Sequence, residues 1–210
     1  MVRFNARAVA LTGALMIVPA VAGCGYNTIQ TLDEQSSAAK SQIEVQLQRR
    51  ADLIPNLVST VKGYAQHEEE VFTQVAQARA GLLNAIKTGD PQQMADANAG
   101  LTAGLGRLLA VSEAYPQLKA DQSFLRLQDE LTGTENRIAV ARRDYNQAAQ
   151  QYNTYIRRFP QAITAKVIGA KPKTYFEVTS PGAREAPTVD FSKPTTSPPP
   201  ASQSPSPQKP

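Results

Sequence analysis

The chain has few of the residues from which catalytic and metal sites are usually built. Its 210 residues include one cysteine, one histidine and no tryptophan. A single cysteine excludes an intramolecular disulfide, and Cys24 and His67 together supply too few ligands for a Cys/His zinc cluster. The sequence therefore predicts neither a disulfide-stabilised fold nor a zinc or thiol–imidazole site, and we expect no cofactor.

The N-terminal segment has the layout of a secretory signal. Arg3 and Arg7 are followed by an apolar run from Ala8 to Gly23. A helix that crosses the hydrocarbon core needs about 20 apolar residues, so this run is short for a membrane span. A basic stretch followed by about 7–15 apolar residues and then small residues is typical of a signal peptide. The sequence therefore predicts a signal peptide over residues 1–23.

The apolar run ends in Val21, Ala22, Gly23 and Cys24. An aliphatic residue, two small residues and a cysteine resemble the lipobox of bacterial lipoproteins. The resemblance implies that Cys24 receives a lipid and becomes the N-terminus of the mature chain. The alternative is an uncleaved, single N-terminal transmembrane anchor. Both interpretations attach the chain to a bacterial membrane with its bulk extracytoplasmic, because the basic residues flank the inner end of the apolar run.

Removal of the signal peptide leaves a nearly neutral chain. The full sequence has 22 Lys+Arg and 18 Asp+Glu, and the loss of Arg3 and Arg7 leaves 20 bases against 18 acids. The bases alternate with acids along the chain instead of forming one block. We therefore expect no nucleic-acid partner.

Apolar residues at alternating steps of three and four predict helices over most of residues 29–159. The clearest series has ten such steps and reads Phe124, Leu127, Leu131, Thr134, Ile138, Ala141, Tyr145, Ala148, Tyr152, Tyr155 and Phe159. A heptad series that mixes Ala with Tyr is typical of an antiparallel bundle, in which large side chains pack against small ones. A long first helix contains Pro55, where we expect a kink or a division.

The predicted fold class is all-α, an antiparallel up-and-down four-helix-type bundle with a long kinked first helix. Asp90 followed by Pro91 predicts the start of the third helix, and Asp121 the cap of the last one. The predicted loops between the helices lie at about 66–70, 87–90 and 116–121. Gly100 and Gly104, four residues apart, indicate a close approach between helices.

Three domains follow from these patterns: the signal peptide at 1–23, the bundle at 24–180 and a tail at 181–210. The bundle is expected to end with Tyr175 and Phe176 as its last anchor, and with Ile163, Val167 and Ile168 packed onto its end. The tail is rich in Pro, Ser and Thr. Such a segment buries too little apolar surface to fold, so we expect it to be disordered.

Several segments resemble the LemA family. The most specific are QLQRRADLIPNLV and VKGYAQHE, and later segments agree with them: ARAGLL, GRLLAVSEAYPQLKADQSF and LQDELTGTENRIAVARRDYNQAAQQYNTYIRRFP. The resemblance covers about residues 25–177. It implies a membrane-attached helical bundle whose molecular role is not established. Family members are usually described with an N-terminal transmembrane segment, and the lipobox of this chain departs from that pattern.

Two charged clusters are candidate interaction sites. Arg49, Arg50 and Asp52 precede Pro55, and Arg142 and Arg143 lie in the last predicted helix. The clusters either form ion pairs across the bundle or provide a surface for a partner protein or a lipid headgroup.

No catalytic motif accompanies these clusters. His67 and Glu68 resemble the start of a zinc-binding HExxH motif, but Val71 stands where the second histidine is required. The sequence therefore predicts a non-catalytic scaffold, anchored through Cys24, that binds an unknown envelope or membrane protein. Two alternatives stay open: a bundle that binds a lipid or small molecule between its helices, and an enzyme whose acidic residues only the tertiary structure brings together.

Overall fold

The computed structural model describes residues 6–177, with side chains from residue 25 onward. Its helices confirm the all-α class and are α1 (Ala6–Lys62), α2 (Glu69–Thr88), α3 (Pro91–Glu113), α4 (Pro116–Lys119), α5 (Gln122–Tyr155) and α6 (Gln161–Val167). The predicted tail at 181–210 lies outside the described residues, and so does the side chain of Cys24.

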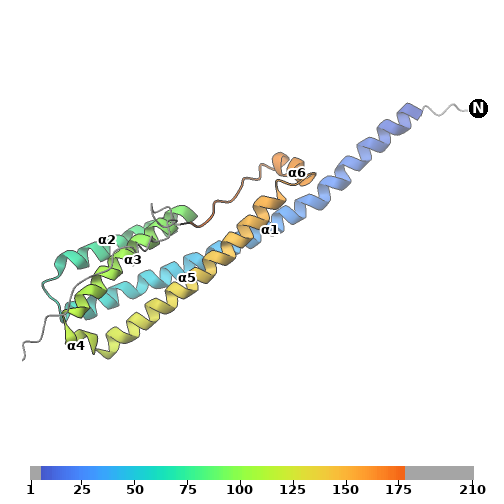
Figure 1. Cartoon of the computed structure of the whole chain (residues 1–210). Coiled ribbons are helices and arrows are strands. Elements are labelled where there is room, and N and C mark those ends of the chain that lie inside the picture. The colour runs from blue at the N-terminus through green and yellow to red at the C-terminus, as the bar shows by residue number, and fades with distance from the viewer. Residues whose placement is uncertain (1–5, 178–210) are drawn as a thin grey trace, which may run out of the picture. The chain divides into compact units, whose positions relative to one another are not determined.

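The two longest helices, α1 and α5, run along each other in opposite directions (Figure 1). Ile29 of α1 packs with Tyr152 near the end of α5, and Arg49 meets Glu130 near its beginning. Most of the predicted heptad series of α5 faces this contact. Ala149 is buried in place of Ala148, because a straight helix turns slowly away from an exact seven-residue repeat.

α1 continues through Pro55 to Lys62, so the proline does not divide the helix, and a kink there stays a prediction. Proline has no N–H, and the carbonyl of Ala51 therefore lacks its usual helical donor. Arg79 of α2 supplies the missing hydrogen bond, since its Nε donates to the Ala51 oxygen at 2.8 Å. The arginine thus joins α2 to α1 at the point where the proline interrupts the bonding ladder.

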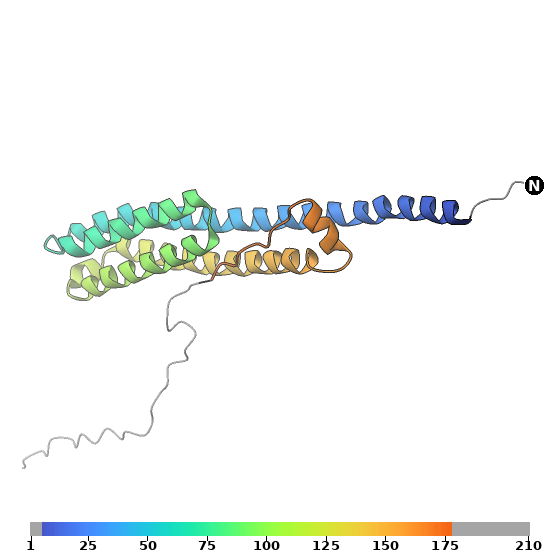
Figure 2. The ribbon, with the colours of Figure 1, turned by 90° about the horizontal axis from the view of Figure 1, so that it is seen from above.

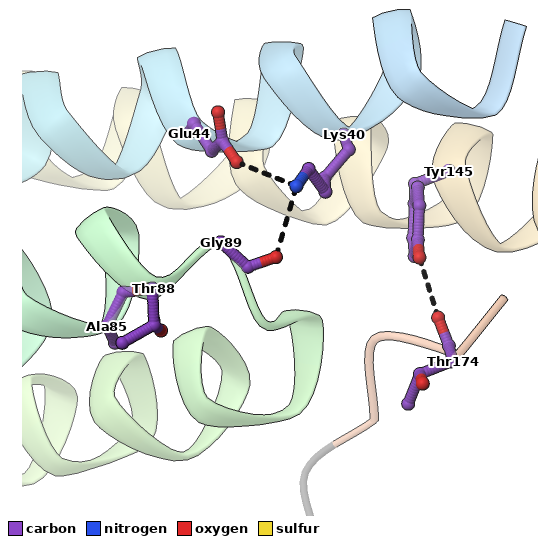
Figure 3. A network of polar contacts seen from close by, with 7 residues as sticks. All are labelled: Lys40, Glu44, Ala85, Thr88, Gly89, Tyr145 and Thr174. Carbon is purple, nitrogen blue, oxygen red and sulfur yellow. Dashed lines mark hydrogen bonds and ion pairs between the residues drawn. The ribbon is translucent and has the colours of Figure 1, made fainter. Parts of the chain in front are cut away.

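α2 and α3 form a hairpin whose turn is fastened to α1. α2 ends at Gly89, which has a φ of 67°, a conformation that favours glycine. Asp90 accepts a hydrogen bond from the Gln93 amide and Pro91 follows it, so the predicted start of α3 is confirmed. Figure 3 shows Lys40 of α1 reaching the turn, where its Nζ donates to the Gly89 oxygen at 3.1 Å.

Gly100 and Gly104 of α3, the two glycines for which a close approach was predicted, differ in their surroundings. A Cβ at Gly104 would lie 3.6 Å from Val75 of α2, which confirms the predicted close approach there. A Cβ at Gly100 would have no atom within 4 Å, so the prediction is wrong for this residue.

The predicted cap of α5, Asp121, is confirmed: its Oδ1 accepts from the amides of Ser123 and Phe124 at 2.8 and 2.9 Å.

After α6, residues 170–177 run back along α5, and we call this segment the strap. Asn153 bonds both the amide and the carbonyl of Lys173, and Asn146 does the same for Phe176. The two asparagines are seven residues apart on the helix, which is a rise of about 10.5 Å. Lys173 and Phe176 are three residues apart in the extended strap, which is about 10 Å, so each asparagine lies opposite its partner. Tyr145 donates a fifth hydrogen bond to the strap, to the backbone oxygen of Thr174 (Figure 3).

The end of the bundle differs in part from the prediction. Phe176 is buried as expected, whereas Tyr175 is partly exposed. Ile163, Val167 and Ile168 do not pack onto the bundle end, because α6 turns its small residue Ala165 inward and leaves these larger side chains exposed.

Candidate interaction surface

Arg50, one of the predicted interaction residues, lies inside the molecule. Its side chain is 5% exposed. Its Nη1 donates a hydrogen bond to Asn98 Oδ1 of α3 and forms an ion pair with Glu135 Oε2 of α5, each at 2.5 Å. Burial lowers the pKa of Arg50, while the neighbouring carboxylate of Glu135 opposes that shift. The ordinary pKa of arginine is far above neutrality, so the side chain stays charged. Arg50 therefore joins three helices through a charged, buried centre.

The rest of this first cluster also has partners within the chain. Arg49 pairs with Glu130 of α5 at 2.8 Å, and Asp52 accepts a hydrogen bond from Gln48 one helical turn away. Both pairs are exposed and contribute little to stability. The ion pairs of the cluster thus cross from α1 to α5, but they end on glutamates and not on the second arginine cluster.

Arg142 and Arg143 are placed differently, on the exposed side of α5. Within residues 25–177 neither has an ion pair. Arg142 borders a cleft of about 260 Å³ between α3 and α5. The α3–α5 cleft is lined by Ala95, Asn98, Ala99, Thr102, Glu135, Ile138, Ala139, Arg142 and Phe176.

The cleft lies between the two clusters. Its lining includes Arg142 of the second cluster, and also Asn98 and Glu135, the two side chains that bind Arg50 of the first cluster. The Nε of Arg50 is buried without a hydrogen-bond partner among the described residues. Sequence reasoning missed Asn98 and Glu135. A signal was present for Asn98, since it lies on the apolar face of α3 between Ala95 and Leu101, where a polar residue needs a buried partner.

The remaining candidate residues do not form a site in the described structure. His67 is exposed in the turn before α2, and Glu68, which precedes the helix, is partly exposed. Across the described residues, no three His, Cys, Asp or Glu side chains are grouped so as to hold a metal ion. In the same part of the chain, no helix combines the length and apolar character needed for a membrane crossing. Lipidation of Cys24 stays a prediction.

The exposed bases beside the cleft give the described structure a surface that can bind an acidic group. The comparison with known families agrees with the sequence motifs. The model of the LemA family matches residues 39–191, which include the arginine clusters and the cleft. The chain belongs to the LemA family. The LemA match also contains Pro55 and Arg79, the pair that completes the bonding of α1.

Three relatives show how this LemA family chain compares with other proteins. Magnetosome protein MamQ 2 of Paramagnetospirillum magneticum is 31% identical over 175 residues, covering 72% of this chain and 64% of the relative. Magnetosome protein MamQ of Magnetospirillum gryphiswaldense is 28% identical over 174 residues, with the same coverage of 72% and 64%. Protein LemA of Metamycoplasma hominis is 27% identical over 121 residues, covering 58% and 54%. The chain thus spans less than two thirds of the length of these relatives.

Proposed function

We propose that this LemA family protein is a membrane-anchored, non-catalytic interaction protein, built as an antiparallel up-and-down four-helix-type bundle. The observation that carries this proposal is that the two arginine clusters differ in their ion-pair partners. Arg49 and Arg50 have glutamate partners inside the chain, whereas Arg142, which lines the α3–α5 cleft, and the exposed Arg143 have no ion pair in the described residues. The second cluster is therefore available to an external acidic group.

The partner we propose is an extracytoplasmic or membrane protein that places an acidic side chain against Arg142 and Arg143. Small-molecule pockets usually enclose about 300–1,000 Å³. The α3–α5 cleft encloses only about 260 Å³, which fits single side chains of a protein better than a lipid or metabolite. Two of the relatives are named as proteins of a cell structure, the magnetosome, which supports a structural role.

The anchor in this proposal is a lipid on Cys24. The residue that follows Cys24 packs against the bundle: Gly25 is buried, and a Cβ there would lie 3.6 Å from Gln161 and Thr164 of α6. A lipidated and processed chain therefore keeps all the contacts described for residues 25–177. Acylation contributes about 0.8 kcal/mol per buried CH₂, and two or three acyl chains hold a protein stably at a membrane.

The anchor is tested by metabolic labelling with a lipid probe. Wild-type protein should incorporate the probe and sediment with membranes, and Cys24→Ala should do neither. Equal labelling and equal fractionation of the two proteins would contradict the lipid anchor.

The partner surface is tested by photo-crosslinking in membranes. A photoreactive amino acid in place of Thr102, at the rim of the cleft, should give a discrete adduct, and one in place of Arg126, at the start of α5, serves as the control. The double variant Arg142→Glu/Arg143→Glu should abolish the adduct. The same adduct from both positions, or an adduct that survives charge reversal, would contradict the proposed surface.

A further inference from the structure

A stripe of large apolar side chains is exposed at the α6 end of the bundle. Phe159 is 84% exposed, Ile163 is 60% exposed and Val167 is 82% exposed. Ile163 and Val167 are four residues apart and lie on the same side of α6, and Phe159 is exposed in the turn that leads into it. Single exposed apolar residues are common, but a contiguous group of this kind marks an interaction site.

The stripe is held in its outward orientation by packing on the other side of α6. Ala165 is buried against Ile29 of α1 and against Tyr152 and Ile156 at the end of α5. The strap that follows α6 is tied to α5 by its asparagine bonds. α6 cannot rotate its apolar stripe inward without losing both sets of contacts.

The surroundings of the stripe are basic. Residues 157–176 contain Arg157, Arg158, Lys166, Lys171 and Lys173 and no acid. Lys173 pairs with Asp33 of α1 at 2.8 Å. The other four bases have no ion pair among residues 25–177. An apolar stripe and four unneutralised bases in the same segment of the chain complement a surface that is negatively charged outside and apolar beneath.

α6 also lies directly beside the point of attachment. The contact of Gly25 with Gln161 and Thr164 places α6 against the residue that follows Cys24. Figures 1 and 2 both show α6 against α1, with the N-terminal part of α1 continuing beyond it. A lipid on Cys24 and an uncleaved N-terminal anchor would each bring α6 to the bilayer surface.

We propose that the α6 face, formed by the apolar stripe and the four unpaired bases, docks on an anionic lipid surface. This inference rests on the proposed membrane anchorage. Docking of α6 holds the bundle at a fixed orientation to the membrane, whereas an anchor alone would leave it free to swing. Each base near an anionic surface changes the ratio of docked to undocked protein about fivefold.

The absence of tryptophan from the chain makes a direct test possible. Full-length protein carrying Phe159→Trp is reconstituted in vesicles of brominated phosphatidylcholine with or without phosphatidylglycerol. The bromine atoms should quench the reporter in the anionic vesicles. The matched control is Leu125→Trp at the opposite end of α5, where the native side chain is 41% exposed, and it should stay unquenched.

The charge contribution is tested by replacing Arg157, Arg158, Lys166 and Lys171 with alanine in the Phe159→Trp protein. Sedimentation with the vesicles should be retained, while quenching should fall. Equal quenching in pure phosphatidylcholine or in the four-alanine variant would overturn an anionic docking surface. Attached protein with an unquenched reporter would overturn the docking alone, and protein that fails to sediment with either vesicle would overturn the anchorage as well.

Discussion

The hydrogen bond from Arg79 to the Ala51 carbonyl gives a prediction that depends on Pro55. The carbonyl belongs to a fully buried residue and lacks its helical donor, because the proline four residues later has no N–H. A hydrogen bond with a charged donor contributes about 1.5–3 kcal/mol, and an orphaned buried acceptor costs a similar amount. We therefore expect Arg79→Met, which keeps the apolar stem, to lower the free energy of unfolding by about 2 kcal/mol.

In a Pro55→Ala background, most of the stability cost of Arg79→Met should disappear. The alanine N–H at position 55 can donate to the Ala51 carbonyl, so loss of Arg79 no longer leaves the acceptor unsatisfied. In this background we expect Arg79→Met to cost less than about 1 kcal/mol, which gives a coupling energy of about 1–2 kcal/mol.

Urea unfolding of the four proteins in this double-mutant cycle measures the coupling. Arg107→Met is a matched control, because Arg107 is exposed and binds only Gln74 of α2 among the described residues. Its cost should be small and equal in both backgrounds. An equal cost of Arg79→Met with and without Pro55 would refute the conclusion that Arg79 compensates for the proline.

Three further predictions follow from the buried polar contacts. Asn153→Ala removes two hydrogen bonds to the strap, at about 1 kcal/mol each, so amide exchange at Lys173 should accelerate about 30-fold by NMR or mass spectrometry. Arg50→Ala should lower the free energy of unfolding by about 3 kcal/mol and Arg49→Ala by less than about 1 kcal/mol in urea, because only the first removes a buried charge. Burial raises the pKa of Tyr145 to about 12. The unfolded pKa is about 10, so folding favours the protonated phenol, and stability should fall between pH 10 and pH 12 by on the order of 2 kcal/mol. Tyr145→Phe should flatten that fall in chemical denaturation across the same pH range.

Much of the helical framework follows from local chemistry. Asp90 with Pro91, and Asp121, mark helix starts because their carboxylates satisfy amides only two or three residues away. The heptad series of α5 predicts its packed face because the period of a helix is the same in any context.

The candidate surface could be predicted only in part. The sequence singled out all four arginines, but their different roles depend on Glu130 and Glu135, which are about 80 residues from Arg49 and Arg50 along the chain. The prediction that α6 packs its large apolar side chains inward was wrong, because the orientation of α6 also depends on residues that are distant in the chain. Ile163 and Val167 look like core residues in a sequence, and only the packing of Ala165 against Ile29 shows that they face away.

The sequence by itself determined the helical class, the helix caps, the family and the apolar segment that ends at Cys24, because each depends on residues that are close together in the chain. The tertiary structure decided which arginines are buried, how the Ala51 carbonyl is satisfied and which side of α6 is exposed. Those outcomes depend on burial and on contacts between distant segments, and the energies of charged and polar groups change most when water is removed from them.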